Sequence, residues 1–268
     1  MKILFEISYV GTAYHGYQVQ NGRDIRTVQG TLQESLEKLF GERYRLSGCS
    51  RTDAGVHARQ FFCTADDVSE RSIPEDKIPI AAAAFLPGDI SVRSARYVGD
   101  AFHPRYDVDY KEYEYTVLNT RLSDPFLFGK AYHYPRALDV EAMDRAAKGF
   151  VGTHDFASFM AQGSSVTSTV RTVKYFDVRR KGDLVIMRVA ADGFLYNMVR
   201  ILCGTLIALS EGRIKEDEIA TIIESRDRSR AGATLPPDGL CLTRVVYPER
   251  VFSPDYVGCE RRCDSDLE

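Results

Sequence analysis

Hydrophobic residues in the first hundred positions follow two spacings, one typical of strands and one typical of helices. The segment from Ile3 to Val10 is rich in aromatic and β-branched residues, which predicts a β-strand. From Thr27, a good N-cap residue, to Phe40, apolar residues share one face and Gly41 can end the segment, which predicts a helix. The remaining segments predict two short strands, a helix and a strand, at 44–47, 59–65, 75–85 and 91–98.

The second half of the chain repeats this β-α-β-β-α-β order with insertions. Alternation places Tyr113, Tyr115 and Val117 on one face of a strand. Asp139 caps a predicted helix, and residues 181–183 form a hairpin turn between two strands. The other predicted elements are strands at 170–179, 184–190 and 242–247, an apolar helix at 194–209 and an acidic helix at 216–224. This is the order of a ferredoxin-like unit.

These orders predict an α+β protein in which two ferredoxin-like β-α-β-β-α-β halves share a mixed, mainly antiparallel sheet. The helices would cover one face of the sheet, and the other face would be open to a broad ligand. We expect the halves to span residues 1–105 and 106–250, followed by an acidic tail at 251–268. The sequence itself shows no internal repeat, so the duplication rests on the order of elements alone.

Composition indicates a soluble cytoplasmic protein. The 268 residues are 44% apolar and 27% charged, as is ordinary for a globular enzyme. No apolar run approaches bilayer length, and the apolar start of the chain leads straight into Glu6, so neither a signal peptide nor a membrane span is expected. The six cysteines are scattered except for Cys259 and Cys263, which lack a second pair of ligands, so we expect reduced thiols and no metal site.

Net charge gives a mild argument against a nucleic-acid partner, but the distribution of charge changes this picture. The net charge is −3 and the isoelectric point about 6.0. Between positions 43 and 63, however, four cations surround one anion, Asp53, while acidic clusters lie elsewhere. This distribution permits a basic cleft on an acidic molecule, which would suffice for phosphate contacts. The four cations are Arg43, Arg45, Arg51 and Arg59.

The carboxylate in that segment has the surroundings of a nucleophile. Arg51 precedes Asp53 by two residues and Gly55 follows it by two. Glycine permits a tight turn that presents the carboxylate at its tip, and the arginine can hold the carboxylate ionised. An ionised, aimed, lone carboxylate is what covalent attack on carbon requires. The spacing alone favours the plainer alternative, a surface turn in which Asp53 only caps the backbone.

A family resemblance favours the nucleophile. The string from Ser50 to Ala58, SRTDAGVHA, resembles the signature of the TruA-type tRNA pseudouridine synthases, and weaker motifs follow in the family's order along nearly the whole chain. The sequence departs from the family at Tyr17, where tryptophan is frequent, and at Glu112 and Glu114, where basic residues are frequent. The weaker motifs are 14–20, 27–30, 86–90, 102–105, 111–115, 194–200 and 239–240.

The resemblance implies the pseudouridine synthase fold and the isomerisation of uridine to pseudouridine, at positions 38, 39 and 40 of the tRNA anticodon stem-loop. Uracil leaves its ribose through nitrogen and returns through carbon, so no cofactor or metal is implied, and the chain has no Rossmann or P-loop glycine pattern. Asp53 would be the nucleophile, attacking either the base or the anomeric carbon. A homodimer is also implied, for which the helix at 194–209 and the loop at 126–128 would offer apolar surface.

The resemblance further assigns Tyr113 and Arg200 to the active site. Tyr113 would stack on the uracil and accept or relay its proton, although Tyr115 points the same way. Arg200 would be the internal cation facing Asp53, with Arg51 as the alternative; an arginine in an apolar helix needs a carboxylate partner or access to the cleft, unless it reaches solvent. Proposed substrate contacts are Gly239 and Leu240 at the base pocket, His57 behind the turn, and Arg23, Arg26, Arg59 and Arg105 on phosphates.

Two other classes of protein compete with this interpretation. A non-catalytic RNA-binding protein would expose aromatic residues on adjacent strands, but it would have no use for the Asp53 turn. A carboxylate-dependent hydrolase or lyase would normally need a second acid or a metal cluster beside Asp53, and the motif contains neither. Neither class explains Asp53, Tyr113 and Arg200 together.

Overall fold

The computed structural model describes residues 2–20, 25–66, 73–163, 166–253 and 255–259. It divides into two compact units. Unit 1 comprises the chain up to Asp109 together with the residues from Arg244 on, and unit 2 comprises Tyr110–Thr243. Residues 244–250, which the sequence analysis counted with the second half, therefore group with the first.

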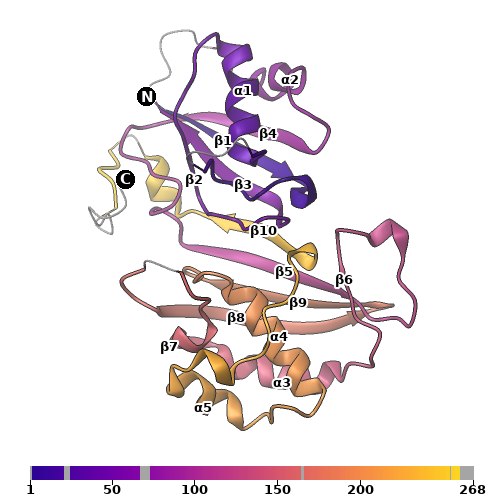
Figure 1. Cartoon of the computed structure of the whole chain (residues 1–268). Coiled ribbons are helices and arrows are strands. Elements are labelled where there is room, and N and C mark those ends of the chain that lie inside the picture. The colour runs from indigo at the N-terminus through magenta and orange to yellow at the C-terminus, as the bar shows by residue number, and fades with distance from the viewer. Residues whose placement is uncertain (1, 21–24, 67–72, 164–165, 254, 260–268) are drawn as a thin grey trace. The chain divides into compact units, whose positions relative to one another are not determined.

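Unit 1 contains the predicted β-α-β-β-α-β order (Figure 1). Strand β1 lies between β3 and β4 and is antiparallel to both, and β2 pairs with the far side of β3. The resulting strand order, β4-β1-β3-β2, is that of a ferredoxin-like sheet. The elements are β1 (Lys2–Tyr9), α1 (Val28–Phe40), β2 (Leu46–Gly48), β3 (His57–Ala65), α2 (Ile78–Ala83) and β4 (Ile90–Val98).

Local sequence explains the position of α1. The Thr27 side chain accepts a hydrogen bond from the Gly30 amide, and Gly41 ends the helix in the left-handed region at a φ of 79°. Apolar residues of α1 and of one face of β1 are completely or nearly completely buried, so the helix is held by burial of that face. They include Ile3, Phe5, Ile7, Leu32 and Leu36.

The segment after β10 (Leu240–Val246) packs against unit 1. Val251 is buried in a cluster with Leu4, Val98 and Phe102. The Tyr256 hydroxyl donates to the Asp107 carboxylate at 2.6 Å. The predicted acidic tail at 251–268 is therefore not all separate from the fold: Val251, Phe252 and Tyr256 pack here because their side chains are largely apolar.

Unit 2 has the predicted core elements and two short additional strands. The order β5-β9-β8-β7 is antiparallel throughout, whereas β6 pairs parallel with β5. The α+β class with a mixed, mainly antiparallel arrangement is thus confirmed. The elements are β5 (Tyr110–Leu118), β6 (Tyr132–His133), α3 (Val140–Ala147), β7 (Gly152–Asp155), β8 (Val170–Lys181), β9 (Leu184–Ala191), α4 (Met198–Ser210) and α5 (Glu218–Ser225).

The helix-covered face of β5 is apolar and buried. Tyr113, Tyr115 and Val117 lie on it as predicted, and α4 packs against this strand. On the opposite face, Glu114 lies opposite Arg188, whose guanidinium is 3.7 Å from Asp177. Charged side chains of both signs therefore lie together on this second face. Among the described residues, no helix has the length and apolar character needed to cross a bilayer.

Candidate active site

Asp53 lies on the turn between β2 and β3. The turn closes with a hydrogen bond from the Val56 amide to the Asp53 carbonyl at 3.2 Å, and Gly55 has a φ of 80°. A residue with a Cβ rarely adopts that backbone conformation, so glycine is needed here. The Asp53 side chain is half-buried, between an exposed Arg51 and an exposed Ala54. The sequence-predicted turn is therefore present, with the carboxylate near its tip.

A second backbone segment, residues 11–17, holds this turn from behind. The Tyr17 amide donates to the Thr52 carbonyl and the Gly55 amide donates to the Tyr14 carbonyl, both at 3.1 Å. The Gly11 amide donates to Nδ1 of the buried His57 at 3.0 Å. These bonds fix the residues on both sides of Asp53. In this arrangement His57 supports the turn, whereas the sequence analysis assigned it to substrate.

Glycines let the two segments approach closely. A Cβ added to Gly11 would lie 1.9 Å from the Val56 carbonyl oxygen. Gly16 has a φ of 91°, and its added Cβ would lie 2.6 Å from the Thr52 carbonyl oxygen. No real Cβ contact is that short, so both positions require glycine for this packing.

Tyr17, which replaces the family's frequent tryptophan, packs beneath the same region. Its ring lies 4.2 Å from that of Phe61, centroid to centroid. A Cβ on Gly48 would lie 2.5 Å from the Tyr17 ring. The smaller aromatic ring is therefore tightly packed, and the departure from the family leaves the support of the turn intact.

The predicted phosphate contacts have different surroundings. Arg59 is exposed on β3. Arg105 is half-buried, with its guanidinium 5.6 Å from the centre of the Tyr106 ring and its amide donating to Nδ1 of His103. Arg51 is exposed and forms no hydrogen bond or ion pair with any residue that the structure describes. Arg23 lies outside the described residues.

Arg26 braces the loop that supports Asp53. Its Nη2 donates to the Tyr14 hydroxyl at 2.9 Å and lies 3.6 Å from Asp89, while its guanidinium stacks 4.5 Å from the Tyr14 ring centre. The Tyr14 hydroxyl donates to Asp89 at 2.6 Å. Burial and the Asp89 carboxylate raise the pKa of Tyr14 to about 12, so this hydroxyl remains a donor.

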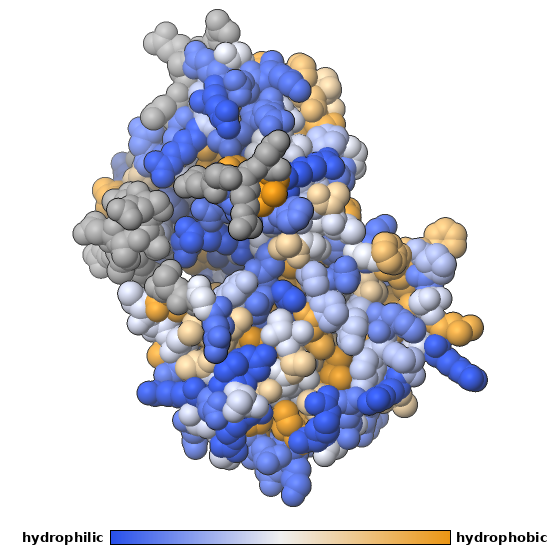
Figure 2. All heavy atoms as spheres, viewed as in Figure 1, coloured by the Kyte–Doolittle hydropathy of each residue, from blue (hydrophilic) through white to orange (hydrophobic). Residues whose placement is uncertain are grey.

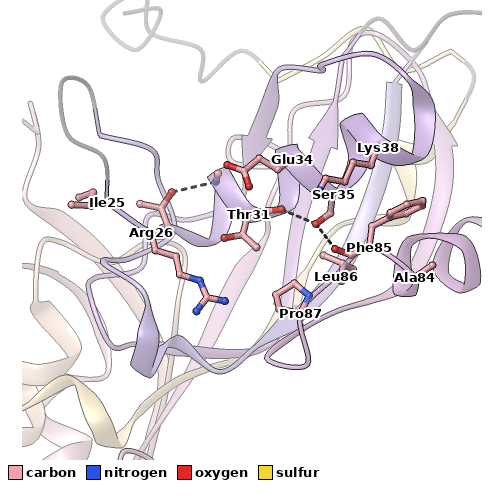
Figure 3. Close-up of a pocket in the computed structure, with 12 residues that line it drawn as sticks. Ile25, Arg26, Thr31, Glu34, Ser35, Lys38, Ala84, Phe85, Leu86 and Pro87 are labelled. Carbon is pink, nitrogen blue, oxygen red and sulfur yellow. Dashed lines mark hydrogen bonds between the residues drawn. The ribbon is translucent and has the colours of Figure 1, made fainter.

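Arg26 also borders a hollow of about 670 Å³ beside α1 (Figure 3). Ser35 closes part of its wall by donating to the Thr31 and Phe85 carbonyls. At the start of α1 the amides of Val28, Gln29 and Gly30 are already bonded to Gly16, Tyr17 and Thr27. The helix N-terminus therefore offers no unsatisfied amides among these three to an anion.

In unit 2, the two tyrosines of β5 have different partners. Tyr113 is 6% exposed, and its ring meets that of Phe194 edge-on, with 5.1 Å between centroids. The Tyr115 hydroxyl donates to the Pro236 carbonyl at 2.7 Å, and burial raises the pKa of Tyr115 well above its usual range. The Tyr115 hydroxyl is thus used within the fold.

Arg200 is anchored at the start of α4. Its Nε donates to the Leu235 carbonyl at 2.6 Å and its Nη1 donates to Asn197 Oδ1 at 2.7 Å. The sequence analysis missed both acceptors and began the helix at Phe194, whereas the structure begins it at Met198. The only sequence signal was an asparagine three residues before the arginine, since asparagine tolerates the left-handed backbone.

Gly239 and Leu240 enter β10 beside β5. A Cβ on Gly239 would lie 2.5 Å from the Thr116 carbonyl oxygen and 3.0 Å from the Tyr115 ring. Leu240 is buried. Among the described residues, no group of histidine, cysteine or acidic side chains could hold a metal ion.

Comparison with known proteins assigns the chain to a family. The sequence model of the tRNA pseudouridine synthases matches residues 7–107 and 146–248. Asp53 and Arg200 lie inside the matched ranges and Tyr113 lies between them. The chain therefore belongs to the tRNA pseudouridine synthase family, a family of isomerases, and the resemblance found in its motifs is confirmed.

Curated relatives agree along almost the whole length. The chain is 43% identical over 246 residues to tRNA pseudouridine synthase A of Thermoanaerobacter sp. (strain X514), which covers 92% of this chain and 99% of the relative. It is 43% identical over 241 residues to the protein of that name from Acetivibrio thermocellus, an alignment that covers 90% of this chain and 97% of the relative. It is 42% identical over 246 residues to tRNA pseudouridine synthase A of Caldicellulosiruptor bescii, an alignment that covers 92% of this chain and 99% of the relative.

Proposed function

We propose that this protein converts uridine to pseudouridine at positions 38, 39 and 40 of the tRNA anticodon stem-loop, in the cytoplasm, with Asp53 as the nucleophile. The observation that carries the assignment to Asp53 is the turn itself. Its carboxylate lies on a backbone that hydrogen bonds from residues 11–17 hold in place, in a chain that belongs to the tRNA pseudouridine synthase family. A fixed carboxylate is what attack on carbon requires, because misplacement of a reacting group is costly.

The chemistry is an isomerisation. The bond between uracil N1 and ribose C1′ breaks, a bond between C5 and C1′ forms, and one proton leaves C5 while one is gained at N1. Asp53 forms a covalent adduct with the nucleotide on the way, through the base or through the anomeric carbon. Tyr113 stacks on the uracil, and its hydroxyl accepts or relays the proton from C5.

The function is tested directly by mapping pseudouridine in tRNA from cells with and without the gene for this protein. Loss of pseudouridine at positions 38, 39 and 40, restored by the wild-type protein, supports the proposal. Loss at other tRNA positions would contradict the anticodon assignment while keeping the class of reaction. Unchanged tRNA would contradict the proposed substrate.

The role of Tyr113 is tested by removing its hydroxyl. We expect Tyr113→Phe to lower the single-turnover rate about 100-fold or more, because general acid–base groups contribute on that scale, while tRNA affinity is kept. Tyr115→Phe is the matched control on the same strand face. It loses the bond to Pro236, so it should lower the free energy of unfolding by about 1 kcal/mol and keep most of the rate. A near-normal rate in Tyr113→Phe would contradict the role of the hydroxyl in proton transfer and leave stacking on the uracil as the only role of Tyr113.

Binding of tRNA must come from local charge, because the net charge of −3 repels a polyanion. We propose that exposed arginines of unit 1 contact phosphates and that the enzyme recognises the shape of the arm. Recognition of shape suits three neighbouring target positions with different flanking bases, because phosphate contacts give no information about the base sequence. Arg59 and Arg51, both exposed, are the clearest candidates. The half-buried Arg105 is a further candidate, and so is Arg26 in the conformation that braces Tyr14.

Replacing Arg59 with alanine should weaken tRNA binding equally for all three target positions. The slope of log affinity against log salt should fall by about 0.7 to 0.9 for the lost phosphate contact. Lys77→Ala is the control, since that exposed lysine is already paired with Asp76 at 3.2 Å. Modification lost at one position and kept at the other two would contradict shape recognition.

We also propose a homodimer. The apolar helix that the sequence analysis offered as contact surface is buried within unit 2 as α4. The other predicted contact surface, the loop at 126–128, lies between β5 and β6; Phe126 and Phe128 are 90% and 84% exposed there, and the nearby Leu122 is 79% exposed. Figure 2 shows apolar side chains projecting from this loop. Exposed apolar side chains of this size favour a protein contact. A monomer mass in sedimentation at micromolar concentration would contradict the dimer.

A further inference from the structure

The residue before α4 has an unusual backbone. Asn197 has a φ of 59° and a ψ of 9°, in the left-handed region. Among the described residues it shares this with one other non-glycine residue, Arg226. Arg226 ends α5, where a left-handed residue is a common stop, and its side chain is 68% exposed. Asn197 instead starts a helix, where the cap residue is normally extended.

The Asn197 side chain does not cap α4. An asparagine at this position would ordinarily accept from an amide of the first turn, and no such bond is formed. Its Oδ1 accepts from Arg200 Nη1 at 2.7 Å instead. A left-handed backbone costs of order 1–2 kcal/mol for a residue with a Cβ. At Asn197 this cost is met where the side chain points to Arg200 and does not cap the helix.

Arg200 is itself in an unfavourable place. It lies in the first turn of α4, where the helix dipole disfavours a cation. Hydrogen bonds from its Nη1 to Asn197 Oδ1 and from its Nε to the Leu235 carbonyl help to offset this cost. Because the two acceptors bond to different nitrogens of a planar group, together they fix the plane of the guanidinium.

The second of these acceptors is rigid. The Leu235 amide donates back to the Arg200 carbonyl at 3.3 Å. One turn along α4, a Cβ on Gly204 would lie 1.9 Å from the Ala233 carbonyl oxygen, and Thr205 Oγ1 accepts from the Gly232 amide at 2.9 Å. The segment before Leu235 is thus locked onto the helix. The Asn197 amide is the acceptor that a single substitution can remove.

We propose that Asn197 is a positioning residue for the pseudouridine synthase reaction: its left-handed backbone exists to direct its amide oxygen to Arg200 and hold the guanidinium in one orientation. This inference rests on the proposed function and on the active-site role that the family resemblance implies for Arg200. The competing explanation is that the backbone merely needs a turn between residues 194 and 198. Glycine would serve that turn at least as well, because it has no Cβ penalty.

Asn197→Gly separates the two explanations. We expect it to lower the single-turnover rate on an unmodified tRNA transcript about 10- to 100-fold, since small misplacements of catalytic groups cost this much. The affinity for tRNA should stay within about twofold, and the melting temperature should stay the same or rise as backbone strain is relieved. Asn197→Asp keeps an oxygen in the same place and tolerates the backbone, so it should recover part of the lost rate.

Arg226→Gly is the control for glycine at a left-handed position, and its rate should equal that of the wild type. Three results would overturn the inference: a wild-type rate in Asn197→Gly, equal losses in the Gly and Asp variants, or a loss of rate that tracks a fall in melting temperature. Failure of the proposed function is distinguishable, because the wild-type protein would then form no pseudouridine in the same assay.

Discussion

Replacing Asp53 with asparagine is expected to lower pseudouridine formation by about 10⁴-fold or more while leaving the fold and tRNA affinity unchanged. The amide has the shape of the carboxylate but cannot form the covalent adduct, and removing a nucleophile commonly costs this much. The backbone of the turn is held by amide and carbonyl groups, which the substitution leaves in place. Single-turnover assays at saturating enzyme, with filter binding and thermal melting in parallel, measure the three quantities.

The matched control is Asp76→Asn, the same chemical change on a side chain that is 70% exposed in unit 1. It should leave rate, affinity and melting temperature unchanged. Substantial pseudouridine formation by purified Asp53→Asn would sink the assignment of the nucleophile. Loss of both rate and tRNA affinity in that variant would instead indicate that Asp53 acts in binding.

Replacing Gly11 with alanine should have the second-largest effect, although Gly11 contacts no substrate in the proposed reaction. The added Cβ would meet the Val56 carbonyl oxygen at 1.9 Å, so the two backbone segments must separate and the bond to His57 is lost. We expect a loss of about 2–4 kcal/mol in the free energy of unfolding, in the range of forced overpacking with a broken buried hydrogen bond. The rate should also fall about 100-fold because the turn that carries Asp53 moves.

Denaturant unfolding and single-turnover assays check this prediction. Gly99→Ala is the control, because an added Cβ there meets nothing within 4 Å. Gly11→Ala should differ from it in both measurements. Normal stability together with a normal rate would show that residues 11–17 do not hold the turn.

The sequence correctly predicted those features of the fold that depend on the type and spacing of side chains. Thr27 and Gly41 marked the ends of α1 within one residue, and alternation placed Tyr113 and Tyr115 on one buried face. The Asp53 turn followed from Gly55, whose positive φ the structure confirms. In each case a local preference and a burial pattern pointed to the same structure, so the sequence was sufficient.

Sequence reasoning missed contacts made by backbone groups and contacts between side chains that lie far apart in the sequence. The bonds from residues 11–17 to the turn join amides and carbonyls, and any residue type except proline carries both. The attachment of Arg26 to Tyr14 and Asp89 was not predicted, because its partners lie 12 and 63 positions away in the sequence. The start of α4 was placed too early because an apolar run does not reveal a left-handed residue inside it.

The segment that covers the cluster of Leu4, Val98 and Phe102 has a consequence for synthesis on the ribosome. Val251 completes this cluster, although it is made nearly 150 residues after Phe102, once all of unit 2 has been translated. Domains generally begin to fold as they emerge, N-terminus first. An apolar surface of the first unit to emerge therefore stays uncovered until Val251 has been translated, so the final stability of unit 1 depends on residues that follow the whole of unit 2.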